Sequence, residues 1–209
     1  MASKTDIFNR ILGFAGIVDS VSDPDEDTPH AASVRRHYQS ELEDLLAETP
    51  WNFATLTDVF PVATGVTHAR YSGVYSINSD SLAVWRVNGY ENKVSELGHR
   101  VLWEVEQRYV LTDDGSCTAQ YITRNVDEGI FSPKFRKALE LRCAIPVARE
   151  RGMTAGDFDR LENDARIAVA KAKYADSLEG SARPIRSNYL ADARLGRSVV
   201  NASQTIGNF

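Results

Sequence analysis

The strongest constraint on the fold lies in residues 121–178, where the pattern predicts the end of a strand and then two consecutive helices. Ser132 supplies a capping hydroxyl, Pro133 suits the first helical position, and Gly152 is placed to end this helix. The segment Thr154–Asp157 starts the next helix in the manner of a capping box, with Asp where Glu is usual. We therefore expect a helical hairpin around which the rest of the chain is organised.

The second helix of this hairpin carries a line of small apolar residues. Its apolar positions alternate by three and four residues: Phe158, Leu161, Ala165, Ala168, Ala172 and Ala175. This is heptad spacing, and the small side chains would let a neighbouring helix approach closely. The pattern leaves two partners open, a helix of the same chain or a helix of a second copy. Within the first helix, Pro146 lacks a backbone donor, which predicts a kink.

Two further helices are expected near the N-terminus, one over Asp6–Phe14 and one from Thr28 to about Glu48. The loop Asp23–Asp27 between them spaces three carboxylates like the start of a calcium site. The sixth position is Thr28 rather than Gly, and the twelfth is Val34 rather than Glu. We therefore favour carboxylates placed before a helix N-terminus, where the helix dipole stabilises negative charge.

From Phe53 to Arg124 the pattern becomes that of β-strands. Strands are predicted at residues 51–53, 74–77, 82–87, 103–111 and 117–122. Asn88-Gly89 marks a turn, and the Asp113–Ser116 cluster is expected to join the last two strands as a hairpin. The β-rich part is therefore read as an insertion between the second and third helices.

Together these elements predict an α+β fold: an antiparallel helical bundle with an inserted β-rich lobe and an extended C-terminal arm. We assign residues 1–52 and 126–179 to the bundle, 53–125 to the lobe and 180–209 to the arm. The bundle is thus built from both ends of the folded part, with the lobe between them.

The arm is locally basic and has no firm apolar period. Ordering about thirty backbones costs on the order of 30 kcal/mol, whereas eight apolar side chains return about 1.5–3 kcal/mol each when fully buried. We therefore expect the arm to be ordered by a partner; the alternative is a floppy terminus. The arm residues predicted to contact this partner are Arg183, Ile185, Arg186, Tyr189, Leu190, Arg194 and Phe209.

Composition excludes several classes of protein. The chain has 209 residues and a net charge of -5, which gives no general attraction to nucleic acid or acidic lipid. No apolar run of about 18 residues would span a membrane, and the N-terminus lacks the apolar core of a signal peptide. Cys117 and Cys143 form neither a disulfide framework nor a metal spacing, so a reducing cytoplasm is the expected compartment.

Motifs for catalysis are not found. There is no G-x-S-x-G elbow, Gly-rich phosphate loop or dinucleotide fingerprint. For an enzyme, the candidate residues are Cys143, His37 and His99, but a mid-helix cysteine beside alanine and isoleucine is typical of a core. His30 and His37 lie too far apart to share a metal, and His37 is expected to pair with Glu41. We therefore predict no catalytic residue, no metal and no cofactor.

Four basic residues are candidates for contacts with phosphate: Arg35, Arg36, Lys171 and Lys173. Acidic residues on the same two helices compensate their charge. Solvated helix faces are therefore the favoured interpretation, and reading of a DNA sequence is not expected.

A resemblance to a known family spreads along most of the chain. The best match is Tyr121–Asp127, then Phe131–Phe135, then Ala138-Leu139, where the family has a tyrosine-isoleucine strand, an Asp-containing loop and a Phe-to-Ala-Leu helix start. The order of earlier parts also fits: Ile11-Leu12, Arg35-Arg36, Trp51–Ala54 and Tyr75–Val87. On these residues the chain resembles the phage head-to-tail connector proteins, also called adaptors or tail tubular protein A.

Two departures from the family pattern fall in the β-rich part. Where many members have Leu-Pro before an Asp, this chain has Ile77-Asn78 before Ser79-Asp80. Where an arginine often follows the leucine, Ala83 follows Leu82. The contacts that the β-rich part makes in family members are therefore the ones least directly carried over to this chain.

The resemblance implies a structural protein without enzymatic activity. Family members form a ring, usually of twelve copies, between the portal vertex and the tail, around the DNA channel, and the C-terminal segment often docks on the portal. The implied partners are the portal protein, a downstream tail or nozzle protein and further copies of the chain, with non-specific proximity to genomic DNA and no membrane. The implied location is the head-tail interface of the virion, and the host cytoplasm during assembly. The alternatives are a tail terminator, a minor tail protein or a small cytosolic α+β enzyme.

Overall fold

The computed structural model describes residues 3–91 and 102–179. The predicted arm, residues 180–209, lies outside the described residues together with every contact residue named for it. His99 also lies outside them.

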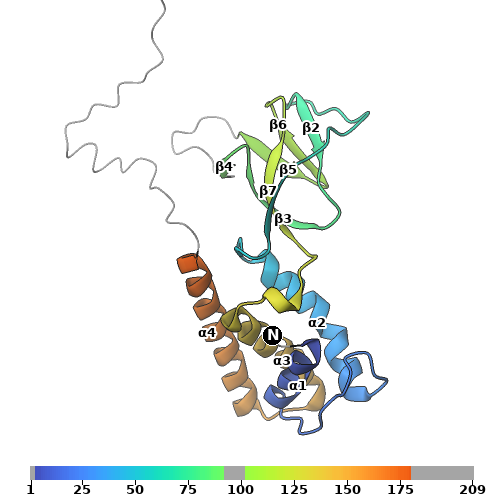
Figure 1. Cartoon of the computed structure of the whole chain (residues 1–209), viewed down its shortest axis with the longest axis vertical. Helices are drawn as coiled ribbons and strands as arrows, with labels where there is room; N and C mark the ends of the chain where they lie inside the picture. The colour runs from blue at the N-terminus through green and yellow to red at the C-terminus, as the bar shows by residue number, and fades with distance from the viewer. Residues whose placement is uncertain (1–2, 92–101, 180–209) are drawn as a thin grey trace, which may run out of the picture. The chain divides into compact units, whose positions relative to one another are not determined.

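The helices of the described part are α1 (Lys4–Phe14), α2 (Pro29–Ala47), α3 (Pro133–Arg151) and α4 (Ala155–Glu179), with a short 3-10 helix at Glu128–Ile130 (Figure 1). All four α-helices were expected from the sequence, and the start signals of α2 and α3 act as predicted. Thr28 accepts a hydrogen bond from the backbone N–H of Ala31, and Ser132 accepts one from Phe135. Gly152 ends α3 in the left-handed conformation, with φ 76°, which only glycine adopts without cost.

The apolar line on α4 packs against α3 of the same chain. Leu161, Ala165, Ala168 and Ala172 are buried in one apolar cluster with residues of α3 such as Ala144. Small side chains at this seam let the two helices lie close together. The choice between a partner in the same chain and one in a second copy is therefore answered in favour of the same chain.

The other helices complete this core. Ile7, Phe8, Ile11 and Leu12 of α1 are fully buried, and α1 packs on α2 and α3. α3 runs without a break through Pro146, so the proline does not interrupt the helix. The missing hydrogen bond is tolerated because packing on three neighbouring helices holds α3 in place.

The strands form two antiparallel sheets in the described part, and all follow α2 and precede α3 (Figure 1). They are β1 (Thr55–Val59), β2 (Gly73–Ser76), β3 (Ser81–Val87), β4 (Tyr90–Glu91), β5 (Trp103–Glu106), β6 (Tyr109–Thr112) and β7 (Thr118–Thr123). One sheet has the order β1-β7-β3-β4 and the other β2-β6-β5. The α+β class is confirmed, whereas the division into bundle, lobe and arm stays a prediction.

Residues 51–53 were expected to form a strand, and this is wrong. The Trp51 ring is buried in the helical core, where it lies 4.8 Å from Phe135 and donates a hydrogen bond of 2.8 Å to the carbonyl of Leu45. Turning the ring inward forces the chain into a tight turn, closed by a bond from the N–H of Ala54 to the Trp51 carbonyl. The strand therefore begins only at Thr55.

The single strand predicted at residues 103–111 is a hairpin of β5 and β6. Glu106 pairs with Tyr109, so Gln107 and Arg108 form the turn. Gln107 has φ 55°, a conformation that is uncommon for a residue other than glycine. Neither Gln107 nor Arg108 is a residue type typical of a tight turn, which is why the sequence does not reveal it.

The predicted hairpin through Asp113–Ser116 is also wrong, because β6 and β7 belong to different sheets. β7 instead lies between β1 and β3 and pairs with both. Asn88 explains how the connection is held: its side chain donates to Asp114 at 2.7 Å and to the Ser116 carbonyl at 2.8 Å. The Asn88-Gly89 turn itself is confirmed, with φ 50° and 83°, and joins β3 to β4.

Candidate functional site

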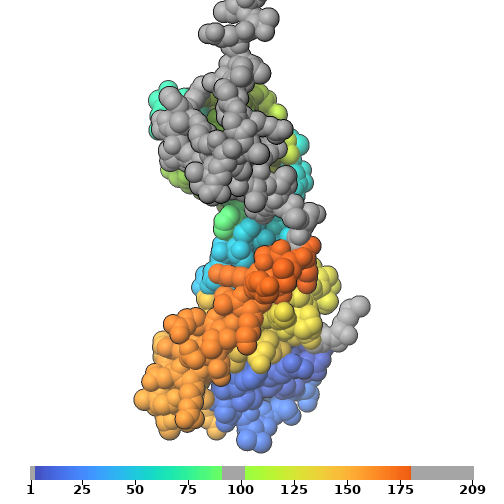
Figure 2. Space-filling model, turned by 90° about the vertical axis from the view of Figure 1, so that its left-hand side faces the viewer, coloured from blue at the N-terminus to red at the C-terminus, as the bar shows by residue number. Residues whose placement is uncertain are grey.

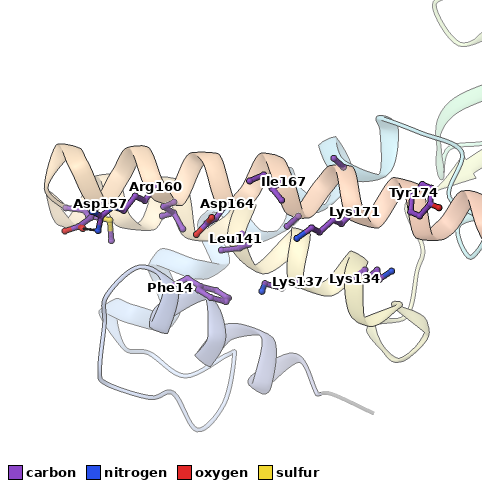
Figure 3. Close-up of a pocket in the computed structure, with 14 residues that line it drawn as sticks. Phe14, Lys134, Lys137, Leu141, Asp157, Arg160, Asp164, Ile167, Lys171 and Tyr174 are labelled. Carbon is purple, nitrogen blue, oxygen red and sulfur yellow. Dashed lines mark ion pairs between the residues drawn. The ribbon is translucent and has the colours of Figure 1, made fainter.

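The candidate site is a groove of about 930 Å³ between α1, α3 and α4, called the α4 groove from here on (Figure 3). Its apolar lining includes Phe14 from α1, Leu141 from α3, and Met153, Leu161, Ile167 and Tyr174 from α4 and the turn before it. The groove arises because α1 packs on α2 and α3 and ends at Phe14, which leaves part of α4 uncovered.

Large apolar side chains remain exposed in the groove. Phe14 is 38% exposed, Ile167 41% and Tyr174 65%. α4 also presents its outer face to solvent, as the space-filling view shows (Figure 2). Contiguous exposed apolar surface on a soluble domain marks a contact surface, because water contact with it is unfavourable.

The charges around the groove are unevenly placed. Lys134 and Lys137 on α3 and Lys171 on α4 lie toward one end, and all three are exposed (Figure 3). Within the described residues, none of the three has an ion-pair partner. At the other end Asp157 pairs with Arg160 at 3.8 Å. The groove therefore offers an apolar floor with one basic end, which suits an apolar segment that carries carboxylates.

Cys143, a candidate nucleophile from the sequence, is fully buried among the helices. Burial raises the pKa of its thiol far above the ordinary value, so the nucleophilic thiolate is not formed near neutral pH. Cys117 is likewise buried, and burial raises its pKa to about 11. Both cysteines act as small core residues.

His37 does not form the expected pair with Glu41; its Nε2 lies 3.0 Å from a carboxylate oxygen of Glu150 on α3. Glu150 also accepts bonds of 2.6 Å from the Ser33 hydroxyl and 2.6 Å from Arg36. The hydrogen bonds from Ser33, His37 and Arg36 lower the pKa of Glu150 to about 2. Three α2 side chains thus bind one α3 carboxylate, which clamps the two helices.

Most of the basic residues considered for phosphate contacts are used inside the chain. Arg35 donates to the carbonyls of Pro24 and Glu26, each at 2.9 Å, and Lys173 pairs with Glu48 at 2.8 Å. Arg36 binds Glu150, as above. Lys171 remains, and it lies in the α4 groove.

The acidic residues before α2 include Glu26, which binds groups of the loop that leads into this helix. Glu26 accepts hydrogen bonds from the backbone N–H groups of Ser22 and Asp23 and from the Thr28 hydroxyl. Among the described residues, no group of three His, Cys, Asp or Glu side chains is placed to hold a metal ion. In the same part of the chain, none of the helices combines the length and apolarity needed to cross a bilayer.

The groove was not predicted from the sequence. A signal for it exists on α4, where Ile167, Tyr174 and Leu178 follow one another at spacings of seven and four residues. These residues form a second apolar line beside the small-residue seam, and all three are exposed. Exposed Phe14, at the end of α1, has no such signal because its role depends on where α1 stops relative to α4.

Neither a protein-family model nor a curated protein matches this chain. The functional assignment therefore rests on the residues and on the geometry of the described part.

Proposed function

We propose that this protein is a structural virion protein: a ring-forming head-to-tail adaptor that joins the portal vertex to the phage tail around the DNA channel. The observation that carries the proposal is the α4 groove, an exposed apolar surface with a basic end and without a reactive group. Such a surface acts by binding another macromolecule.

The residues that carry the family resemblance support this function through their role in the core. Tyr121 and Ile122 lie in β7, the central strand between β1 and β3, and both are buried. The rings of Phe131 and Phe135 pack edge-to-face with centroids 5.0 Å apart, and the ring of Phe53 lies 5.7 Å from that of Phe131. The resemblance is thus carried by residues that join strands to helices, as suits a protein that acts through its shape.

In this role the protein resides at the head-tail interface of the virion, after assembly in the host cytoplasm. Its partners are the portal protein, a downstream tail or nozzle protein and further copies of itself in a ring of about twelve, as in the family it resembles. Genomic DNA passes nearby without being read. The arm, residues 180–209, is assigned to contact the portal or the neighbouring subunit.

Removal of the arm tests this assignment. The described part up to Glu179 forms one compact unit, so a chain lacking residues 180–209 is expected to keep its helical signal in circular dichroism. The portal protein of the same phage should bind the full chain and lose at least about tenfold in affinity for the truncated chain. Undiminished binding by a folded truncated chain would reject the role of the arm. A position in the tail rather than at the portal would favour a tail terminator or a minor tail protein.

A further inference from the structure

The α4 groove needs an occupant with two properties. Its apolar floor, with Phe14 and Ile167 exposed, requires an apolar side chain. Its basic end, formed by Lys134, Lys137 and Lys171, requires carboxylates. A matching occupant would carry an apolar side chain and carboxylates in one segment.

A segment with both properties lies elsewhere on the same chain, in the loop of residues 18–27, called the acidic loop here. Val18 is 99% exposed, although valine is apolar. Asp19, Asp23, Asp25 and Asp27 follow it, and all four are exposed. The apolar and acidic groups that the groove requires therefore occur together within ten residues.

The acidic loop is held in one conformation by the helices. The side chain of Asn9 on α1 donates to the Val21 carbonyl at 3.0 Å and accepts from the Val21 N–H at 2.8 Å. Arg35 on α2 binds the carbonyls of Pro24 and Glu26. A segment already fixed in shape loses little conformational freedom when it binds, which favours its use as a contact.

The exposure of Val18 also shows that the loop does not occupy the groove of its own copy. Two complementary patches on one chain give a two-fold dimer when two copies bind each other reciprocally, and a heterologous contact when each copy binds the next. When the rotation between copies closes, such a contact makes a ring.

We propose that the α4 groove binds the acidic loop of a second copy, with Val18 against the apolar floor and the loop carboxylates at the basic end. This inference rests on the proposed ring-forming function and names the surfaces that meet in the ring. Duplex DNA is a weaker candidate occupant, because its phosphates would contact the lysines and leave the apolar floor uncovered.

Cysteine cross-linking tests the contact directly, since the two native cysteines are buried. The full chain with Val18→Cys and Ile167→Cys is oxidised under mild conditions, both alone at high concentration and after assembly on the portal protein. Disulfide-linked dimers and longer ladders are expected on a non-reducing gel. Mixing the two single variants should give dimers and no ladder, because each copy then carries one half of the contact.

The matched control places the second cysteine on another face of the same helix. Asp159 is exposed on α4 and does not line the groove. The Val18→Cys and Asp159→Cys pair is therefore expected to cross-link no more than either single variant. Equal ladders from this pair and the Ile167 pair would overturn the proposed contact.

Charge reversal gives an independent readout. Lys137→Glu with Lys171→Glu should weaken self-association by about three- to tenfold, because exposed ion pairs contribute modestly. Adding Asp23→Lys and Asp25→Lys to the same chain should restore part of that loss. Rescue is expected only when the two patches face each other, so absence of rescue counts against the proposal.

The outcomes separate this inference from the proposed function. Rings that form on the portal without the Val18–Ile167 cross-link would overturn the contact and leave the adaptor role standing. Cross-linked ladders from a chain that does not bind portal would support the contact and reject the adaptor role. A 30-base-pair duplex that binds the wild-type chain but not the lysine variant, with no cross-link in either state, would assign the groove to nucleic acid instead.

Discussion

Glu140 is the charged side chain that lies deepest among the described residues, with 1% of it exposed. It sits on α3 beside α1, and the nearest charge is the guanidinium of Arg10, whose Nε is 3.9 Å from Oε1. Burial raises the pKa of Glu140 above its ordinary value, and Arg10, Arg136 and Lys137 oppose the rise only partly. A carboxylate that is buried and incompletely paired costs stability when it is ionised.

The first prediction follows from the sign of this shift. Because the folded state holds the Glu140 proton more tightly than the unfolded state, stability from this group is greatest below its unfolded pKa and falls as pH rises through the folded pKa. Glu140→Gln is therefore expected to raise the free energy of unfolding by about 1–2 kcal/mol at pH 8, and by less at pH 4. Urea denaturation at both pH values measures the difference, with exposed Glu179→Gln as the control. A less stable Glu140→Gln chain at pH 8 would show that its pairing with Arg10 outweighs burial.

Glu150 gives a prediction of opposite sign. Its pKa is lowered to about 2, so its contribution is present above the unfolded value of 4.5 and is lost as pH falls toward 2. Glu150→Gln should reduce the free energy of unfolding at pH 7 by about 0.5–1 kcal/mol, a modest effect because the group is partly exposed. The reduction should vanish near pH 2. An equal loss at both pH values would mean that packing, and not charge, explains the clamp on α2.

At the scale of the helices, the small-residue seam of α4 explains why α3 and α4 lie close together. Ala172 is 1% exposed in this seam, whereas Ala155 at the start of the same helix is exposed. Ala172→Leu is expected to lower the free energy of unfolding by about 1–3 kcal/mol, because a larger side chain must displace its packed neighbours. Ala155→Leu makes the same change in solvent and should stay within about 0.5 kcal/mol of the parent chain. Thermal unfolding of the two variants checks the prediction, and equal melting temperatures would contradict it.

The helices could be predicted because their signals are local. Ser132 and Gly152 act on backbone groups within a few residues of themselves, and the α4 seam repeats in the sequence itself. Strand pairing is not local in this way: β7 pairs with β1, more than fifty residues before it in the chain. The turn at Gln107 and Arg108 contains no glycine or asparagine, so the residue types do not indicate a turn there.

The candidate site could be predicted only in part, for the same reason. The burial of Cys143 agrees with its mid-helix place beside Ala144 and Ile145, but the partner of His37 lies on another helix, at Glu150. The α4 groove depends on where α1 ends relative to α4, which is a tertiary relation. Lys171 was considered from the sequence for a phosphate contact, but its place in one groove with Lys137 depends on how α3 and α4 pack.

For the whole molecule, we propose a subunit that binds further copies of itself. The described part has an apolar groove with a basic end and an exposed acidic loop, which we propose to meet in neighbouring copies. A ring forms when each copy binds the next and the rotation between copies closes. The arm, residues 180–209, adds the predicted contact to the portal.

Imaging the assembled complex tests the proposed ring-forming adaptor role. The purified protein is mixed with the portal protein of the same phage, and the complex is examined by cryo-electron microscopy. We expect a ring of density beneath the portal with an open channel along its axis. Helices α1–α4 of each copy should fit into this density. Portal particles without such a ring, in a sample where the protein is folded and in excess, would contradict this role.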